Sequence, residues 1–305
     1  MVTLRYQAIL RTAGYWLASA VVLWLVWRGF DGAQAWQRLK VADLSWLLIA
    51  WCLLTIQLLA SSLRWQLTAR QLGLRIATPK AIGQYYVSML CNLTLPGGVL
   101  GDAGRAWHNR QQTDLATSAA AVVLERVAGQ LAMVLALVIA LSWQLRSTVF
   151  THPFWSIGVG LSVALFIAWA PRLPRAAWLE RLIGWMHDAW FSQHARWQQL
   201  GYTSLILGAN LLAFYACARA VDVPLSAGSA LLVLPATLLV MALPVSVAGW
   251  GVREAGAALI WPIAGVPSDA AIAASVAYGL MATASALPGL WWLVGARGGS
   301  FGHRD

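Results

Sequence analysis

The chain has 305 residues, of which 60% are hydrophobic and only 10% charged, and its mean hydropathy is +0.66. Because soluble domains carry about 25% charged residues, this composition excludes an ordinary soluble protein and indicates a polytopic membrane protein. Its 21 Lys and Arg against 11 Asp and Glu leave a net charge of +10. Without a soluble domain to carry it, that charge predicts contact with anionic lipid and no nucleic-acid partner.

The first apolar run covers about residues 12–28 and follows two basic residues, Arg5 and Arg11. This arrangement resembles a signal peptide, but no cleavage site with small residues follows the run. The chain continues instead with Arg28-Gly29-Phe30-Asp31. We therefore expect an uncleaved first membrane helix with its N-terminus in the cytoplasm.

Further apolar runs long enough to cross a bilayer follow along the chain, since a spanning helix needs about 20 residues. The six runs cover residues 12–28, 44–63, 117–142, 154–170, 202–220 and 270–295. Two shorter apolar stretches, 81–112 and 228–265, are interrupted by Pro and Gly. The sequence thus predicts an all-α membrane protein in which residues 1–305 form a single transmembrane domain.

Each interrupted stretch contains one copy of a repeat, in which Leu-Pro is followed by four residues, a Gly, three residues and an Arg. One copy runs from Leu95 to Arg105 and the other from Leu243 to Arg253, at an offset of 148 residues. A broken helix at membrane depth is tolerated only where its backbone faces protein or a wet cavity. Broken segments at matching places in two halves of a chain indicate the binding site of a transporter.

The distribution of Lys and Arg separates two arrangements of these stretches. If both cross the membrane, giving eight spans, 10 of these residues lie on each side, contrary to the positive-inside rule. If both enter and return, giving six spans and two re-entrant hairpins, 14 lie inside and 6 outside, with Arg126 within a span. We predict the second arrangement and keep eight spans as the alternative. The hairpins then form an inverted repeat, with halves of approximately 1–146 and 147–297.

Residues 171–200 separate the two halves and contain large apolar residues at helical spacing from 178 onwards, with polar residues between them. This pattern predicts an amphipathic helix on the cytoplasmic leaflet, and an ordinary linker helix is the alternative. Residues 298–305 are predicted to form a flexible tail, so that both termini lie in the cytoplasm.

The two repeats carry charges directly after their turns. We expect Asp102 to cap a short helix whose first turn contains Arg105. The second short helix is expected to begin near Gly251, with Arg253 and Glu254 in its first turn. A helix N-terminus together with an arginine suits a phosphate, so these two sites would bind an anionic headgroup from either face. The alternative is that both arginines only extend to the membrane interface.

Glu125 and Arg126 lie inside a predicted span. A charge at the centre of a spanning helix costs about 3 kcal/mol on insertion scales, and adjacent helical positions diverge by about 100°. Each side chain therefore needs a partner on another element. We expect Asp102 to pair with Arg126, and Arg105 or Arg253 to pair with Glu125. Ionisable residues at this depth indicate a functional site, with a structural ion pair as the alternative.

Two uncharged polar residues of the apolar runs, Asn92 and Tyr278, are added as candidate headgroup contacts, although such residues more often join neighbouring helices. The cysteines Cys52, Cys91 and Cys217 are scattered, which indicates neither a disulfide framework nor a metal site. We expect no cofactor.

The ordered motifs N-x-x-L-P-G-G-x-x-G-D-x-x-R from Asn92, Glu-Arg at 125–126, and Leu-Pro with Gly-Trp-Gly-Val-Arg-Glu up to Glu254 resemble a known family. They are similar to the flippase-type transmembrane domain of the lysylphosphatidylglycerol synthase family, over roughly residues 10–297. The resemblance implies two inverted repeats with re-entrant segments and, in the best-known members, movement of an aminoacylated phospholipid between leaflets. It places the headgroup site around six charged residues: Asp102, Arg105, Glu125, Arg126, Arg253 and Glu254.

Since the sequence ends at Asp305, we expect a stand-alone member without the soluble aminoacyl-transfer domain, whose cargo need not be lysylphosphatidylglycerol. The expected function is transport, not catalysis: a flippase or scramblase of the bacterial inner membrane for an anionic phospholipid or a polyprenyl-phosphate-linked lipid. One alternative is a lipid-linked glycosyltransferase, although the first loop offers only Asp31 and Asp43 as acidic residues. Another is a non-transporting accessory protein of a glycolipid pathway. The oligomeric state stays open, with a dimer as one option.

Overall fold

The computed structural model describes residues 17, 21, 23–30, 32–95, 98–144, 177–193, 195–242 and 249–298. This part of the chain is helical, with short turns and no strand, so the predicted all-α class is confirmed for it. Several predicted features lie outside the described residues: the run 154–170, about half of the run 12–28, the turn 243–248 and the tail beyond residue 298.

Within the described part of the chain, four helical segments are long and apolar enough to cross a membrane. They are α3 (Leu44–Gln71), α6 (Leu115–Gln144), α10 (Arg196–Ala220) and Ser268–Val294, which comprises α13 (Ser268–Ala286) and part of α14 (Gly289–Gly298). Each corresponds to one of the predicted apolar runs. The carboxylate of Asp114 precedes α6 and accepts the N–H of Thr117 at 3.0 Å, and hydrogen bonds from Thr117 hold the pKa of Asp114 below its ordinary value.

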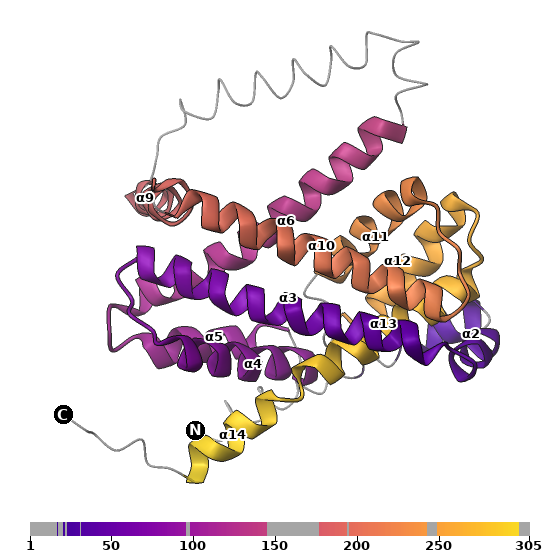
Figure 1. Ribbon diagram of the computed structural model, residues 1–305, viewed down its shortest axis with the longest axis horizontal. Helices are drawn as coiled ribbons and strands as arrows, with labels where there is room; N and C mark the ends of the chain where they lie inside the picture. The colour runs from indigo at the N-terminus through magenta and orange to yellow at the C-terminus, as the bar shows by residue number, and fades with distance from the viewer. Residues whose placement is uncertain are drawn as a thin grey trace.

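Helices α3 and α10 lie side by side and run in opposite directions along the long axis of the molecule (Figure 1). At what we call the first end, Gln199 of α10 donates to Thr68 of α3 at 2.9 Å. At the second end, the N–H of Asp43 before α3 donates to the carbonyl of Ala220, the last residue of α10, at 2.8 Å. These two bonds define the molecule's two ends.

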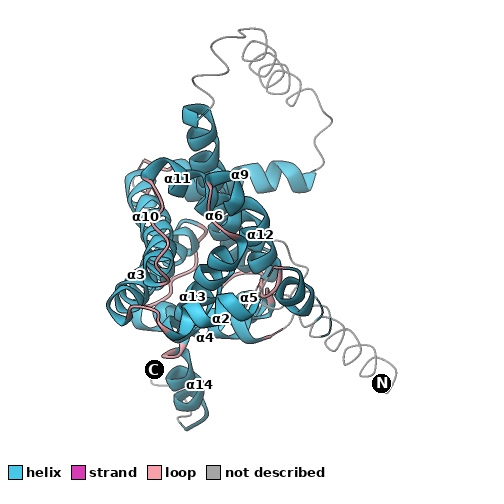
Figure 2. Cartoon of the chain, turned by 90° about the vertical axis from the view of Figure 1, so that its right-hand side faces the viewer, coloured by secondary structure: helices cyan, strands magenta, loops and turns pink. Residues whose placement is uncertain are grey.

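Two helical hairpins complete the fold. Helices α4 (Thr78–Thr94) and α5 (Leu100–Asn109) pack against each other, as do α11 (Ala227–Met241) and α12 (Val252–Ile260). The first hairpin begins and finishes at the first end, and the second hairpin begins and finishes at the second end (Figure 1). Figure 2 shows the described chain as helices joined by loops and turns. At 10 and 9 residues, α5 and α12 are each about 15 Å long, half the thickness of a bilayer core.

The repeat offset of 148 extends from the motifs to the helices. Adding 148 to the bounds of α3 gives 192–219, close to α10, and adding it to those of α4 gives 226–242, close to α11. The bounds of α5 and α6 shift to 248–257 and 263–292, which match α12 and then α13 with α14. The six-span count and the re-entrant, inverted character of the hairpins stay predictions.

The described part of the predicted segment 171–200 belongs to two helices. Helix α9 (Ala177–Phe191) ends before a turn in which the N–H groups of Ala195 and Arg196 both donate to the carbonyl of Ser192. Residues 196–200 therefore belong to α10. Gln199 also donates to the carbonyl of Ala189 at 3.1 Å, which fixes α9 against the first end. The position of α9 at the membrane interface stays a prediction.

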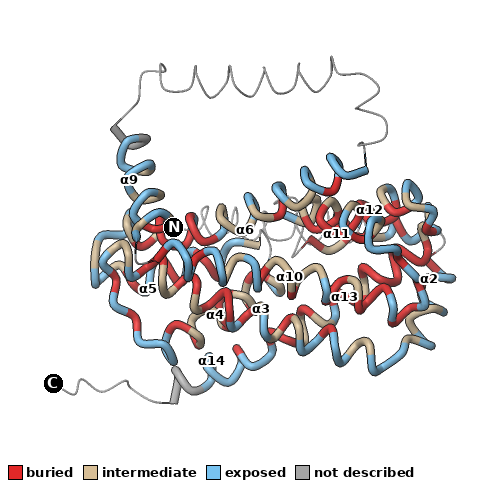
Figure 3. Tube along the Cα trace, turned by 45° about the horizontal axis from the view of Figure 1, so that its top comes forward, coloured by how far each residue is buried: buried red, intermediate tan, exposed pale blue. Residues whose placement is uncertain are grey.

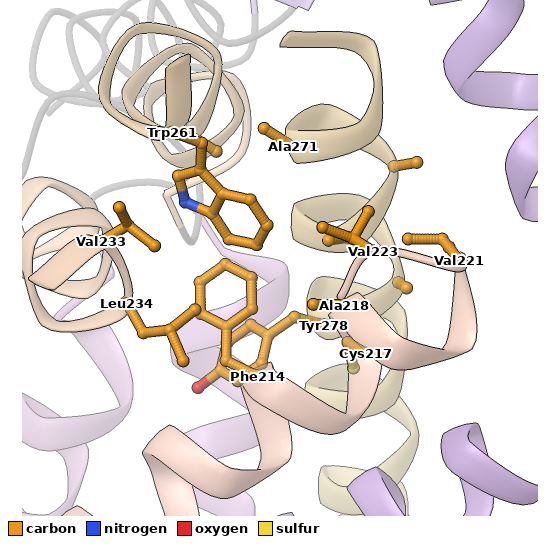
Figure 4. Close-up of a cluster of buried hydrophobic side chains, with 14 of the residues drawn as sticks. Phe214, Cys217, Ala218, Val221, Val223, Val233, Leu234, Trp261, Ala271 and Tyr278 are labelled. Carbon is orange, nitrogen blue, oxygen red and sulfur yellow. The ribbon is translucent and has the colours of Figure 1, made fainter. Parts of the chain in front are cut away.

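The main core lies near the second end, between α10, α11, α12 and α13, with helix η2 (Trp261–Ala264) closing it (Figure 4). The ring of Phe214 stacks on Tyr278 at 4.6 Å between centroids and lies 5.6 Å from the ring of Trp261. Small residues of α13, such as Ala271 and Ala274, are fully buried and allow close helix packing. By contrast, α9 and α14 are mostly exposed (Figure 3).

Candidate functional site

The first short helix, α5, begins at Leu100, earlier than the sequence predicts. The first N–H groups of a helix have no acceptor within the helix. Here the neighbouring helix supplies one, because Oδ1 of Asn92 accepts the N–H of Gly101 at 2.8 Å. Asp102 consequently lies within the first turn of α5 and does not cap it, so that prediction is wrong. Arg105 lies in the second turn and not in the first.

The second short helix, α12, begins at Val252 as expected, with Arg253 and Glu254 in its first turn. Gly251 precedes it with φ +85°, a backbone conformation that glycine adopts readily and other residues avoid. Oε2 of Glu254 accepts the N–H of Gly251 at 2.7 Å. One carboxylate therefore both caps the helix and remains available to Arg253.

Five ionisable residues from α3, α5 and α6 form what we call the N-terminal charge group: Arg64, Asp102, Arg105, Glu125 and Arg126. Asp102 is paired with both Arg105 and Arg126, which confirms the predicted Asp102–Arg126 pair. Ser88 of α4 also donates to Oδ1 of Asp102 at 3.0 Å. The side chain of Arg126 is 43% exposed, whereas Asp102 and Arg105 are buried. Arg126 is therefore the accessible member of this set of three residues, and Asp102 and Arg105 lie in the protein interior.

Glu125 forms its ion pair with Arg64, so the predicted pairing with Arg105 or Arg253 is wrong. Nη2 of Arg64 lies 2.8 Å from Oε1 of Glu125 and 3.0 Å from its backbone carbonyl oxygen. Arg64 follows the apolar run 44–63 and resembles a loop residue in the sequence, but α3 continues to Gln71 and buries it. The correct partner thus comes from the middle of a long helix.

Aromatic side chains surround Arg105. Its Cζ lies 4.7 Å from the ring centroid of Trp65 and 4.4 Å from that of Tyr85. The two rings are 6.5 Å apart, so the guanidinium lies in the corner between them. The hydroxyl of Tyr85 also donates to Oε1 of Glu125 at 3.4 Å. Cation–π contacts stabilise a desolvated guanidinium in this position.

The C-terminal charge group consists of Arg253 and Glu254, held by Ser275 of α13. Nη2 of Arg253 lies 2.6 Å from Oε1 of Glu254, and Nε donates to Ser275 Oγ at 3.0 Å. Ser275 in turn donates to Oε1 of Glu254 at 3.0 Å. The rings of Trp250 and Tyr278 lie 5.0 and 5.5 Å from the guanidinium, so this arginine too is flanked by aromatic residues.

Helix α10 contacts Arg64 of the N-terminal charge group and Tyr278, which flanks the C-terminal charge group. Nη1 of Arg64 donates to Thr203 at 3.2 Å, and the hydroxyl of Tyr278 donates to Oδ1 of Asn210. Thr203 and Asn210 are separated by two helical turns, about 10 Å. The predicted site residues therefore form two neighbouring sets: Asn92, Asp102, Arg105, Glu125 and Arg126 in one, and Arg253, Glu254 and Tyr278 in the other.

Sequence reasoning missed Arg64, Trp65, Tyr85 and Ser275. Ser61, Arg64 and Thr68 recur at spacings of three and four along α3 and are all buried, a polar stripe that could have identified Arg64. Among the residues that the structure describes, no three His, Cys, Asp or Glu side chains are grouped as metal ligands would be.

Comparison with models of protein families gives a match over most of the chain. Residues 11–289 match the family described as the lysylphosphatidylglycerol synthase TM region, a range that includes both hairpins and both charge groups. Among curated proteins, none matches the chain. The family resemblance of the motifs is thereby confirmed and, together with the four apolar helices, supports a multi-pass protein embedded in the membrane.

Proposed function

The chain belongs to the lysylphosphatidylglycerol synthase transmembrane family, and from this premise we propose that it is a flippase or scramblase for an anionic lipid. The cargo is an anionic phospholipid or a polyprenyl-phosphate-linked lipid, moved between the leaflets of a bacterial inner membrane. The observation that carries the proposal is the N-terminal charge group, in which three arginines and two carboxylates meet between helices of spanning length.

Ionised side chains inside a membrane protein are expensive and mark substrate pathways more often than structural contacts. A purely structural role needs only matched pairs, such as Arg64 with Glu125. Asp102, however, is shared by two arginines, and one of them, Arg126, has a side chain that is 43% exposed. This arrangement supports exchange of partners, in which a headgroup replaces the carboxylate at the guanidinium groups.

We further propose six spans and two re-entrant hairpins that enter from opposite faces. The backbone N–H of Arg75, before α4, donates to Gln112, after α5, at 3.1 Å, so both ends of the first hairpin lie at the first end. Arg38 and Asp269 form an ion pair of 2.7 Å that holds the start of α13 at the second end. These contacts favour hairpins over the eight-span count.

The first end faces the cytoplasm in this proposal. Three of the arginines counted in the charge distribution, Arg64, Arg105 and Arg253, are buried in the two charge groups and do not belong to loops. Removing them changes the ratio of Lys and Arg from 14 inside and 6 outside to 12 and 5, so the positive-inside bias persists. Both chain termini are then cytoplasmic.

In the mechanism, Arg105 and Arg126 replace the water around the lipid phosphate as the headgroup passes through the protein. Guanidinium groups suit this role because they donate to two oxygens at once and are weakly hydrated. Asp102 pairs with both arginines before the headgroup arrives and thereby offsets the cost of burying them. The acyl or prenyl chain stays in the lipid phase.

The test is leaflet exchange of a fluorescent phosphatidylglycerol in proteoliposomes containing the purified protein. We expect exchange above that of protein-free liposomes, and a fall of about tenfold or more in Arg105→Ala and Arg126→Ala, since a charged hydrogen bond contributes about 1.5–3 kcal/mol. Arg70→Ala is the matched control, because Arg70 is exposed near the end of α3. Undiminished exchange in both site variants would contradict the proposal.

A further inference from the structure

Arg105 and Arg253 are separated by the repeat offset and are both buried, but their guanidinium nitrogens are paired to different extents. In Arg253 every guanidinium nitrogen has a partner. Nε and Nη2 contact Glu254 at 3.0 and 2.6 Å, and Nη1 contacts the sulfur of Met241 at 3.8 Å. Ser275 adds a further bond to Nε at 3.0 Å. Every guanidinium nitrogen of the C-terminal charge group thus already contacts an acceptor of the protein.

Arg105 is in the opposite condition. Its side chain is only 3% exposed, and Nη2 is bonded to Asp102, but Nε and Nη1 have no hydrogen-bond partner among the residues that the structure describes. A buried donor without an acceptor costs free energy comparable with a lost hydrogen bond, and more when it is charged. These two atoms therefore leave Arg105 with donors that an acceptor from outside the chain can use.

The neighbours of Arg105 also have spare donors. The indole Nε1 of Trp65 and Nδ2 of Asn92 are buried without a hydrogen-bond partner. Trp65 contacts the guanidinium directly, and Asn92 caps the helix that carries it. A set of donors that share one neighbourhood matches a ligand with several acceptor oxygens, and a phosphate is such a ligand.

The net charges of the two charge groups also favour a ligand at the N-terminal group. The N-terminal charge group has three arginines against two carboxylates, which leaves one positive charge. The C-terminal group has one of each and is neutral. In a low-dielectric interior, a ligand with a single negative charge balances the first group, whereas a zwitterionic headgroup of no net charge does not.

We propose that the N-terminal charge group binds a lipid phosphodiester of one net negative charge, with Arg105 Nε, Arg105 Nη1 and Trp65 Nε1 donating to its oxygens, and that the C-terminal group binds no phosphate. This inference rests on the proposed function and narrows it to one class of headgroup and one half of the repeat. Arg253 then serves transport by fixing the second hairpin against α13, without touching the headgroup.

The experiment is isothermal titration of the full-length protein in neutral detergent with short-chain phosphatidylglycerol, short-chain phosphatidylcholine and inorganic phosphate. We expect phosphatidylglycerol to bind at least tenfold more tightly than either of the others. Arg105→Gln should weaken that binding about tenfold or more, since a charged donor is lost. Trp65→Phe should weaken it about two- to fivefold, since it keeps the ring against Arg105 and removes only the N–H. Arg253→Gln should leave the affinity unchanged.

Folding is monitored by size-exclusion elution and by circular dichroism, and Trp65→Phe supplies the decisive result if Arg105→Gln fails to fold. Equal affinity for phosphatidylcholine or inorganic phosphate would overturn the inference, as would equal losses in Arg105→Gln and Arg253→Gln. Lipid exchange by the wild-type protein tests the proposed function separately. If the protein exchanges lipid between leaflets but its affinity for phosphatidylglycerol does not depend on Arg105, only this inference is refuted. If the affinity depends on Arg105 but no lipid is exchanged, only the proposed transport function is refuted.

Discussion

Arg64 and Glu125 form a buried ion pair that joins α3 to α6, with 2.8 Å between Nη2 and Oε1 and side-chain exposures of 3% and 4%. The bond from Nη1 of Arg64 to Thr203 extends the contact to α10. One guanidinium thus links three of the four helices of spanning length. Because both side chains are buried, each charge offsets part of the free-energy cost of burying the other.

Removing one partner of this pair should destabilise the protein strongly. We expect Arg64→Met to lower the free energy of unfolding by about 3–5 kcal/mol, because it leaves the Glu125 carboxylate buried without its counter-ion. The measurement is denaturant unfolding in detergent micelles, followed by circular dichroism.

The double variant Arg64→Met with Glu125→Leu separates loss of the pair from loss of packing. Replacing both charges with apolar residues of similar volume is often neutral or stabilising, so most of the stability should return. If the double variant is as unstable as Arg64→Met, the stabilisation comes from packing of the arginine stem, and the ion pair is not its source.

Close packing of the first hairpin gives a second prediction. A Cβ on Gly101 would lie 2.0 Å from the carbonyl oxygen of Ser88, so α5 rests directly on the backbone of α4. We expect Gly101→Ala to lower the free energy of unfolding by about 1–3 kcal/mol, because the two helices must separate. Unfolding is measured as for Arg64→Met.

Gly104, one turn further along the same helix, is the matched control. Nothing lies within 4 Å of a Cβ placed there, so Gly104→Ala meets no clash and gains helix propensity. It should stabilise the protein by about 0.5–1 kcal/mol. Equal effects of the two substitutions would mean that α5 is not in tight contact with α4.

Much of the fold can be predicted from hydropathy, because the apolar runs at 44–63, 117–142, 202–220 and 270–295 correspond to α3, α6, α10 and α13 with α14. Hydropathy is a weaker guide to where a buried helix continues through polar residues. It ends the second run at residue 63, whereas α3 continues to Gln71 because Arg64 and Thr68 find buried partners on other helices.

The candidate site shows the same division. The Asp102–Arg126 pair can be predicted, since an isolated charge in a span requires a counter-charge and Asp102 lies in a nearby motif. The start of α5 at Leu100 cannot be predicted from the sequence, because the side chain that caps it is Asn92 on another helix and not a local residue. The different pairing of Arg105 and Arg253 likewise depends on tertiary contacts, above all on Ser275.

The core near the second end contains a polar pair that can be tested alone. The indole N–H of Trp261 donates to Thr237 Oγ1 at 3.0 Å, and both residues are fully buried. Thr237→Val keeps the shape of the side chain but leaves that N–H without an acceptor. We expect the free energy of unfolding to fall by about 1–3 kcal/mol.

Thr283→Val provides the comparison for this substitution. The hydroxyl of Thr283 donates only within its own helix, to the carbonyl of Gly279, and the residue is half-buried. Its replacement should change the free energy of unfolding by less than about 0.5 kcal/mol. A Thr237→Val variant as stable as Thr283→Val would show that the indole N–H finds another acceptor.

The arrangement of the hairpins predicts which loops share a face of the membrane. Single cysteines at Lys80 and Gln111, at the two ends of the first hairpin, should react with a membrane-impermeant maleimide from the same side. Cysteines at Val41 and Ser226, near the second end, should react from the opposite side. All four positions are exposed, and the parent variant lacks the native cysteines Cys52, Cys91 and Cys217.

In the eight-span arrangement α4 crosses the bilayer fully, so Lys80 and Gln111 would be labelled from opposite sides. Labelling of right-side-out and inverted vesicles therefore distinguishes the two arrangements. Because the backbone N–H of Arg75 donates to Gln112, we expect Lys80 and Gln111 to be labelled from the same side.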